Sequence, residues 1–277
     1  MSKGFIVLAQ NNSDTDYIKQ AYLLAKSLHN SQALVKNISL VTNDLVPDEY
    51  KSAFDQIIEI PFDDQASNSE WKVENRWKLY HATPYEETIV FDADMIVTKD
   101  LSDCWKFAKN YDLFFTSRVL DYRGNTIVDK IYRKTFIEND LPNLYTGMFY
   151  FKKSDNALQF FKLVEYIVYN WQRFFFEVTP NNSQTFFSMD VAVSIAVKLL
   201  GIEEEVTHKH TPFTFVHMKP AIQGWVPVPQ SSYSCIEVYY NKNNELYVGN
   251  YKQIGVFHYV EDAFITDQLE ENLHGTI

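Results

Sequence analysis

Apolar residues in the first part of the chain occur in blocks whose lengths and spacings separate strands from helices. Gly4–Ala9 is a short run of apolar and β-favouring residues, which is typical of a strand. From Tyr17 to Leu28 the apolar residues recur every three or four positions, which predicts an amphipathic helix. Asn37–Thr42 is a second β-favouring run. A strand, a helix and a strand in this order predict the start of a parallel sheet.

Further strands and helices are predicted along the rest of the chain, with polar segments between them. The predicted helices are Pro47–Phe54, a stretch around Arg76–Tyr80, Leu101–Asn110, Asn156–Asn170 and Val191–Leu200. The predicted strands are Gln56–Ile60, Ile89–Phe91, Asp112–Ser117, Tyr145–Phe151, Thr211–Val216, Ile236–Tyr240, Glu245–Val248 and Gly255–Tyr259. We expect an α/β fold with a mostly parallel central sheet flanked by helices, and a C-terminal β-hairpin that turns at Asn241–Asn244.

Two acidic residues follow directly on the predicted strand Ile89–Phe91. If the backbone stays extended from Asp92 to Asp94, both carboxylates lie on the same side of the chain. Two neighbouring anions raise each other's pKa unless a cation is present, and Mg²⁺ or Mn²⁺ prefers oxygen ligands. Asp-x-Asp also occurs in ordinary turns, but ligands of open α/β sheets bind beyond the carboxyl ends of strands. The position of the pair therefore favours a metal site.

Composition narrows the class of protein further. Of 277 residues, 46% are hydrophobic and 16% aromatic, which excludes a disordered chain. The net charge of −11 disfavours nucleic acid or an anionic membrane as the main partner. Cys104 and Cys235 fit no metal-binding spacing and are expected to be reduced. With no signal peptide and no run long enough to span a bilayer, the sequence predicts a soluble cytoplasmic protein.

Taken together, these elements resemble the glycosyltransferases of the GT-A fold, most closely the family 8 group that includes glycogenin and bacterial galactosyltransferases. The resemblance covers most of the chain in order. Its most specific match is Phe91-Asp92-Ala93-Asp94, which is similar to the family's metal-binding Asp-x-Asp motif. It implies a single GT-A-type domain, with a nucleotide-sugar-binding half in residues 1–118 and an acceptor-binding half in residues 119–277.

The resemblance also implies roles for residues of the donor site. The first strand and helix look like the family's nucleotide-binding unit, so that Leu8, Ala9 and Gln10 lie beside the nucleotide and Tyr17 stacks on the base. Lys78 stands where the family keeps a basic residue that reaches the donor diphosphate. The residues implied to bind the donor are Leu8, Ala9, Gln10, Tyr17, Lys78, Asp92, Ala93, Asp94 and Gly147.

Two further residues are placed in the site by the resemblance. Asp190 looks like the aspartate beside the reacting sugar, although a helix cap is an equal alternative from its position. The third metal ligand is implied to be His258, with His217 as the alternate because Lys219-Pro220 and Trp225 follow it. Tyr145 replaces the family's sugar-binding asparagine and Val191 its glutamine, so the identity of the sugar is not carried over.

These observations predict a metal-dependent glycosyltransferase that uses Mn²⁺ or Mg²⁺. The donor would be a nucleotide sugar, a UDP-sugar by resemblance, and transfer to a saccharide, protein or other hydroxyl acceptor would retain the anomeric configuration. One alternative is a Mg²⁺-dependent nucleotidyltransferase or phosphatase, although the loop Gln10–Asp16 has neither the glycines nor the basic residues that nucleotidyltransferases usually carry there. A non-catalytic sugar-binding module is the other alternative.

Overall fold

The computed structural model describes residues 2–67, 69, 72–127, 133–181, 186–218, 236–259 and 264–274. Its main sheet has the strand order β3-β2-β1-β4-β7-β6, and β1, β2, β3 and β4 are parallel. β7 runs antiparallel to both β4 and β6. The strands are β1 (Lys3–Leu8), β2 (Ile38–Val41), β3 (Gln56–Ile58), β4 (Glu87–Phe91), β6 (Leu113–Thr116) and β7 (Tyr145–Lys152). The predicted mostly parallel sheet is confirmed.

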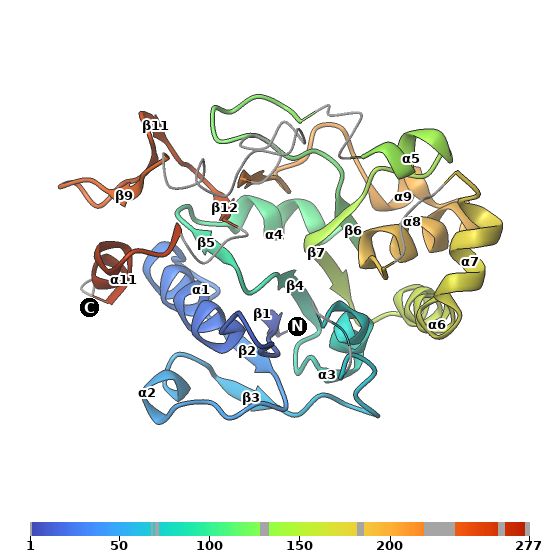
Figure 1. Ribbon diagram of the computed structural model, residues 1–277, viewed down its shortest axis with the longest axis horizontal. Coiled ribbons are helices and arrows are strands. Elements are labelled where there is room, and N and C mark those ends of the chain that lie inside the picture. The colour runs from blue at the N-terminus through green and yellow to red at the C-terminus, as the bar shows by residue number, and fades with distance from the viewer. Residues whose placement is uncertain are drawn as a thin grey trace.

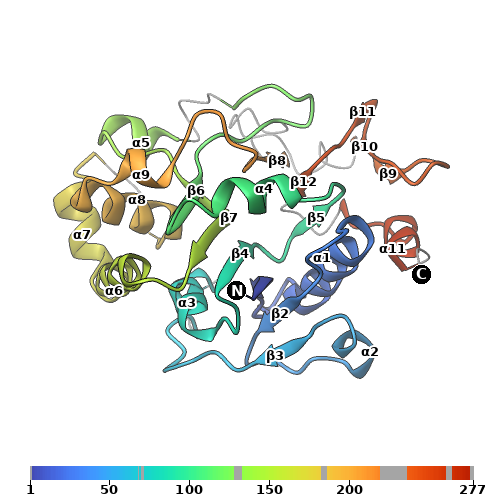
Figure 2. The ribbon, with the colours of Figure 1, turned by 180° about the vertical axis from the view of Figure 1, so that it is seen from behind.

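Helices cover both faces of this sheet, because alternate side chains of its strands point in opposite directions. Phe5 and Val7 of β1 face α1 (Tyr17–Ser31) and α4 (Ser102–Ala108), whereas Ile6 faces the opposite side. There it joins the core made by the 3₁₀ helix η1 (Val73–Lys78), α3 (Leu79–Ala82), α6 (Asp155–Tyr169) and α8 (Met189–Leu200). Figures 1 and 2 show the sheet between these two helical layers.

A small sheet lies beside the main one and joins segments that are far apart in sequence. Its strand order is β5-β12-β8, from β5 (Met95–Val97), β12 (Val256–His258) and β8 (Phe215–His217). β12 pairs antiparallel with β5 and parallel with β8. This pairing brings β12 next to β5, which directly follows the Asp-x-Asp motif.

The predicted C-terminal hairpin is confirmed and has one additional short strand. β9 (Val238–Tyr240), β10 (Leu246–Val248) and β11 (Tyr251–Lys252) form an antiparallel meander, and the β9–β10 turn falls on the predicted asparagine-rich segment. α11 (Asp267–His274) packs against α1, as both views of the ribbon show. The other helices are α2 (Asp48–Lys51), α5 (Lys134–Glu138), α7 (Trp171–Val178) and α9 (Glu203–Val206).

Local interactions set the ends of two predicted helices, and α8 begins at Met189 rather than at the predicted Val191. α8 begins after Ser188, whose hydroxyl accepts a hydrogen bond from the amide of Val191 (3.4 Å), and it ends at Gly201, where φ is 67°. α1 begins after Asp16, which accepts a hydrogen bond from the amide of Lys19 (2.9 Å). α7 and α11 were not predicted. Lys219, Trp225 and Cys235 lie outside the described residues. Across the described ranges, no helix is long and apolar enough to cross a membrane.

Candidate functional site

The Asp-x-Asp segment forms the connection between the two sheets. The chain turns at Ala93 and Asp94 and does not continue extended, because β5 leaves the main sheet to pair with β12. The turn is tied at both ends by backbone hydrogen bonds, from the amide of Asp92 to the carbonyl of Gly147 (2.9 Å) and from the amide of Tyr259 to the carbonyl of Asp94 (3.1 Å). Although the backbone is not extended, the two carboxylates still converge.

His258 completes a cluster with the two aspartates. One ligand atom from each of Asp92, Asp94 and His258 lies within 4.8 Å of the others, and the imidazole Nε2 is 2.9 Å from Oδ2 of Asp94. The side chains are 14%, 15% and 11% exposed, so the cluster is accessible from one side only. Two carboxylates and one imidazole are a donor set that suits Mn²⁺ or Mg²⁺. These residues therefore fit the metal implied by the sequence.

His217, the alternate ligand, lies next to His258 but outside this cluster. The two histidines occupy paired positions of β8 and β12, and their ring centroids are 4.8 Å apart. Because neighbouring side chains in register share a face of the sheet, both rings lie on the same side. Among the described residues, the group that could hold a metal contains His258 and not His217.

Each aspartate of the motif has its own cationic partner. Arg76 forms an ion pair with Asp92, while His258 pairs with Asp94. Burial would raise the pKa of Asp94, but the interaction with His258 outweighs burial and lowers it. Burial would likewise lower the pKa of His258, and the attraction of Asp94 raises it instead. Burial raises the pKa of Asp92 to about 6 against the attraction of Arg76.

Arg76, rather than Lys78, is the basic side chain at the aspartates. Both belong to the 3₁₀ helix η1, which has three residues per turn, so positions two apart point in different directions. Lys78 is fully buried, and its ammonium donates a hydrogen bond to the carbonyl of Asp63. It anchors the loop before η1, whereas Arg76 faces the cleft. Sequence reasoning missed Arg76 because the phase of this short helix is not visible in the sequence.

Gly147 provides space for the cluster. A Cβ atom at this position would lie 2.9 Å from Cε of Met95 and 3.0 Å from Oδ2 of Asp92. Distances this short force the neighbouring groups to move. The resemblance implies that Gly147 binds the donor, and its close neighbours in the structure are the Asp92 carboxylate and Met95.

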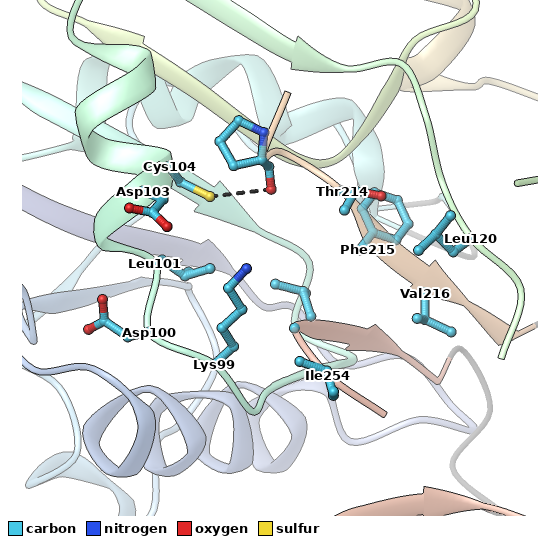
Figure 3. Close-up of a pocket in the computed structure, with 13 residues that line it drawn as sticks. Lys99, Asp100, Leu101, Asp103, Cys104, Leu120, Thr214, Phe215, Val216 and Ile254 are labelled. Atoms are coloured by element: carbon cyan, nitrogen blue, oxygen red, sulfur yellow. Dashed lines mark hydrogen bonds between the residues drawn. The ribbon is translucent and has the colours of Figure 1, made fainter. Parts of the chain in front are cut away.

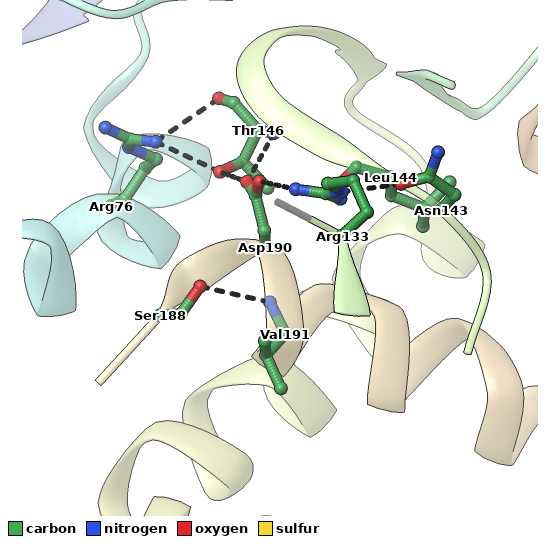
Figure 4. A network of polar contacts seen from close by, with 8 residues as sticks. All are labelled: Arg76, Arg133, Asn143, Leu144, Thr146, Ser188, Asp190 and Val191. Carbon is green, nitrogen blue, oxygen red and sulfur yellow. Dashed lines mark hydrogen bonds and ion pairs between the residues drawn. The ribbon is translucent and has the colours of Figure 1, made fainter. Parts of the chain in front are cut away.

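Asp190 lies across the cleft from the metal cluster and is not the cap of α8, a role taken by Ser188. Its Oδ1 accepts hydrogen bonds from the amide (2.8 Å) and hydroxyl (2.7 Å) of Thr146, and its Oδ2 accepts one from Nη1 of Arg133 (2.8 Å). Arg76 in turn donates to the Thr146 hydroxyl (3.0 Å). Figure 4 shows this network, which links Asp190 to Arg76 and so to Asp92.

A cleft connects the two ends of this network. It is lined by Val73, Arg76, Asp92, Thr146, Phe186, Phe187, Ser188, Met189 and Asp190. Carboxylates of the motif and of α8 therefore face one open space, with an apolar wall from Phe186, Phe187 and Met189. Arg133 and Thr146 are site residues that sequence reasoning missed. Arg133 lies in a polar segment without periodicity, and it gave no signal that could have revealed it.

The implied nucleotide-binding residues lie beside the cluster. β1 and β4 are parallel neighbours with Val7 opposite Phe91, so Leu8, Ala9 and Gln10 lie level with the Asp-x-Asp turn. Gln10 is buried and accepts a hydrogen bond from the side chain of Asn75 (2.7 Å). Tyr17 is the first residue of α1 and packs against the core. The first βα connection therefore opens at the same sheet edge as the acids.

Another hollow lies between the start of α4 and the strands β8 and β12 (Figure 3). Lys99, Asp100, Cys104, Phe215 and Ile254 are among the residues that line it. The Cys104 thiol is buried and donates a weak hydrogen bond to the carbonyl of Pro212, and burial raises its pKa to about 12. A thiol with that pKa is a poor nucleophile. Cys104 is therefore not a reactive thiol of this hollow.

The fold is similar to that of several solved glycosyltransferases. The galactosyltransferase LgtC, in complex with donor and acceptor sugar analogues, has a TM-score of 0.53 and 13% identity over 98% of this chain and 95% of its own. Mouse xyloside xylosyltransferase 1, in its apo form, has a TM-score of 0.52 and 11% identity over 96% of this chain and 100% of its own.

The apo glycosyltransferase GlyE of Streptococcus pneumoniae TIGR4 has a TM-score of 0.51 and 14% identity, and here this chain spans only 61% of the length of its relative. No protein-family model matches the sequence, and no curated protein sequence matches it significantly. The similarity is therefore one of fold, and it confirms the expected GT-A-type architecture.

Proposed function

We propose that this protein is a metal-dependent glycosyltransferase that uses a nucleotide-sugar donor. The observation that carries the proposal is the cluster of Asp92, Asp94 and His258 at the carboxyl edge of the sheet, within a fold shared with glycosyltransferases. In open α/β sheets this edge is where nucleotides bind. Asp92, Asp94 and His258 would hold Mn²⁺ or Mg²⁺. When bound, such an ion would neutralise the charge that develops on the leaving diphosphate.

Residues at the same sheet edge, together with Arg76 of the cleft, would bind and orient the donor. Leu8, Ala9 and Gln10 would lie along the nucleotide, and Tyr17 would stack on the base, which we propose to be uracil. Arg76 would reach the diphosphate, the role that the sequence suggested for Lys78. The geometry favours Arg76, because its guanidinium contacts Asp92 while the Lys78 ammonium contacts Asp63.

Asp190 would lie beside the donor sugar, opposite the metal ligands. It shares the cleft with Asp92 and has an exposed part of its carboxylate available to sugar hydroxyls. The acceptor, a saccharide, protein or other hydroxyl compound, would enter from the open side of the cleft. Transfer would retain the anomeric configuration, as in the family 8 enzymes that the sequence resembles.

A thermal-shift panel tests the proposal. UDP, GDP, CDP and ADP sugars are each added with Mn²⁺ or with EDTA to the native protein, to Asp94→Asn and to Asp103→Asn, whose carboxylate lies on the exposed side of α4. We expect the native protein and Asp103→Asn to be stabilised by a uridine nucleotide with Mn²⁺. A ligand at 100 times its dissociation constant adds about 2.7 kcal/mol. Asp94→Asn should show no such gain.

Turnover separates the enzyme from its alternatives. Mn²⁺-dependent release of UDP from the donor, by hydrolysis or transfer, is the expected result. Binding of the nucleotide sugar without release of UDP would instead favour the non-catalytic sugar-binding module. If no nucleotide sugar stabilises the protein with or without Mn²⁺, the transferase proposal is wrong.

A further inference from the structure

The guanidinium of Arg133 is held in a fixed orientation between two aromatic rings. Its central carbon lies 3.5 Å from the ring centroid of Phe136 and 4.0 Å from that of Tyr145, and the residue is only 5% exposed. Contacts on both faces of the guanidinium are favourable because the faces of aromatic rings attract cations. The N–H groups of a guanidinium lie in its plane, so the two rings do not compete with the hydrogen bonds that Arg133 donates.

Three in-plane hydrogen bonds of Arg133 reach the segment before β7 and Asp190 at the cleft. Nε donates to Oδ1 of Asn143 (2.6 Å), Nη2 donates to the carbonyl of Leu144, and Nη1 donates to Oδ2 of Asp190 (2.8 Å). Arg133 therefore joins the segment leading into β7 to the first turn of α8. Because Thr146 donates twice to the other oxygen, both oxygens of Asp190 already have donors.

This pattern sets the chemical character of Asp190. A carboxylate whose two oxygens already accept hydrogen bonds, one of them from an arginine, is held in one orientation and has fewer lone pairs available for attack than a free one. It can still accept further hydrogen bonds, because a carboxylate has about four acceptor positions. The Asp190 side chain is 23% exposed and lines the cleft, so these remaining positions are accessible from the cleft.

We propose that Arg133 is a positioning residue that fixes Asp190 as an ion-paired hydrogen-bond acceptor for the hydroxyls of the donor sugar. This inference rests on the proposed function. It assigns Asp190 the task of orienting the sugar and not that of attacking the anomeric carbon. Arg133 acts through Asp190 and touches no substrate itself, and Phe136 and Tyr145 keep its guanidinium in place.

Variants of Arg133 test this role against a second ion pair of the same length. Lys152, at the other end of β7, pairs with Asp112 at the same distance of 2.8 Å, and neither residue lines the cleft. We compare Arg133→Gln, Arg133→Lys and Lys152→Gln with the native protein. For each we measure thermal stability, binding of Mn²⁺ with UDP, binding of Mn²⁺ with the UDP-sugar that stabilises the native protein most, and donor turnover.

The expected result is a selective loss of the affinity that the sugar half of the donor contributes. Arg133→Gln should bind Mn²⁺ and UDP as the native protein does, but should lose the additional affinity that the sugar provides, with turnover lower by roughly 10- to 100-fold. Arg133→Lys keeps the charge without the planar fork and should be intermediate. Lys152→Gln should bind and turn over the donor as the native protein does. If Arg133→Gln does not fold, the lysine variant provides the same comparison.

Several outcomes would overturn the inference while leaving the proposed function standing. They are unchanged sugar affinity and turnover in both Arg133 variants, an equal loss of UDP and UDP-sugar binding, and an equal effect of Lys152→Gln. A glycosyl adduct on Asp190 of the native enzyme, detected by mass spectrometry, would also overturn it. A native protein that binds no nucleotide with Mn²⁺ would instead overturn the proposed function, and this inference with it.

Discussion

The candidate site contains two largely buried acid–base pairs of nearly equal length that differ in one chemical respect. Asp94 pairs with His258 at 2.9 Å, and Asp190 pairs with Arg133 at 2.8 Å. Histidine can release its proton near neutral pH, whereas arginine remains charged in proteins. The first pair can therefore exchange its proton for a metal ion, and the second cannot. The difference suggests that one end of the cleft is built to take up a cation and the other to keep a fixed charge pattern.

The largest expected effect separates the two aspartates. Asp94→Asn should abolish detectable Mn²⁺ binding and lower donor turnover by at least about 1,000-fold, because the charge on the leaving group loses its counter-ion. Asp190→Asn should bind Mn²⁺ normally and lose roughly 10- to 100-fold in turnover. Manganese binding followed by electron paramagnetic resonance, together with donor turnover, measures both. Retained Mn²⁺-dependent turnover in Asp94→Asn would contradict the assignment of the first pair.

The next prediction distinguishes the two histidines. His258→Ala should weaken Mn²⁺ binding by at least roughly tenfold because it removes a ligand, whereas His217→Ala should change it by less than about threefold. The two residues are similarly buried and occupy paired strand positions, so each variant is the control for the other. Isothermal titration with Mn²⁺ measures the difference, and a larger loss from His217→Ala would reverse the choice of ligand.

The third prediction concerns pH. The pKa of His258 is raised and that of Asp92 is raised to about 6, so protons compete with the metal for both groups as the pH falls. Mn²⁺ affinity should therefore fall by about tenfold per pH unit once the pH is below the pKa of His258, and more steeply below about 6. Titrations between pH 5 and 8 measure this slope. Arginine side chains remain charged in proteins, so the effect of Arg133→Gln on stability should show no matching change over that range.

The smallest expected effect comes from adding a methyl group at Gly147, beside Asp92 and Met95. In Gly147→Ala the new methyl group must displace Met95 or the Asp92 carboxylate, which should cost about 1–3 kcal/mol of folding stability. Chemical denaturation measures this cost. Movement of Asp92 should also weaken Mn²⁺ binding, whereas movement of Met95 alone should leave it unchanged, so a metal titration shows which group gives way.

How much of the metal cluster could be predicted from the sequence depends on how far apart its residues lie along the chain. Asp92 and Asp94 stand together after an apolar run, so a local pattern was sufficient. His258 was chosen through a family resemblance and its place at the end of a strand, and its contact with Asp94 depends on the pairing of β12 with β5. Long-range pairing of this kind leaves no local signal in a single sequence.

The errors and omissions have equally local causes. The family resemblance favoured Lys78 over Arg76. A 3₁₀ helix presents a different face at each of these positions, and its phase could not be predicted from the sequence. Arg133 lies at the start of the five-residue helix α5, which is too short to show a periodic pattern. The turn at Ala93 and Asp94 could not be predicted from the local sequence, because it follows from the departure of β5 from the main sheet.

The small sheet has a consequence for how the protein is made. β5 precedes β12 in the chain and is synthesised before it, so a nascent chain acquires both aspartates long before it acquires His258. The nascent chain cannot hold a cation with all three groups until the last of these strands inserts between β5 and β8. An ion bound by the three groups would then link the segment around β5 to β12, which is synthesised later. Amide hydrogen exchange at Val256–His258 should accordingly slow down when Mn²⁺ is added to the purified protein.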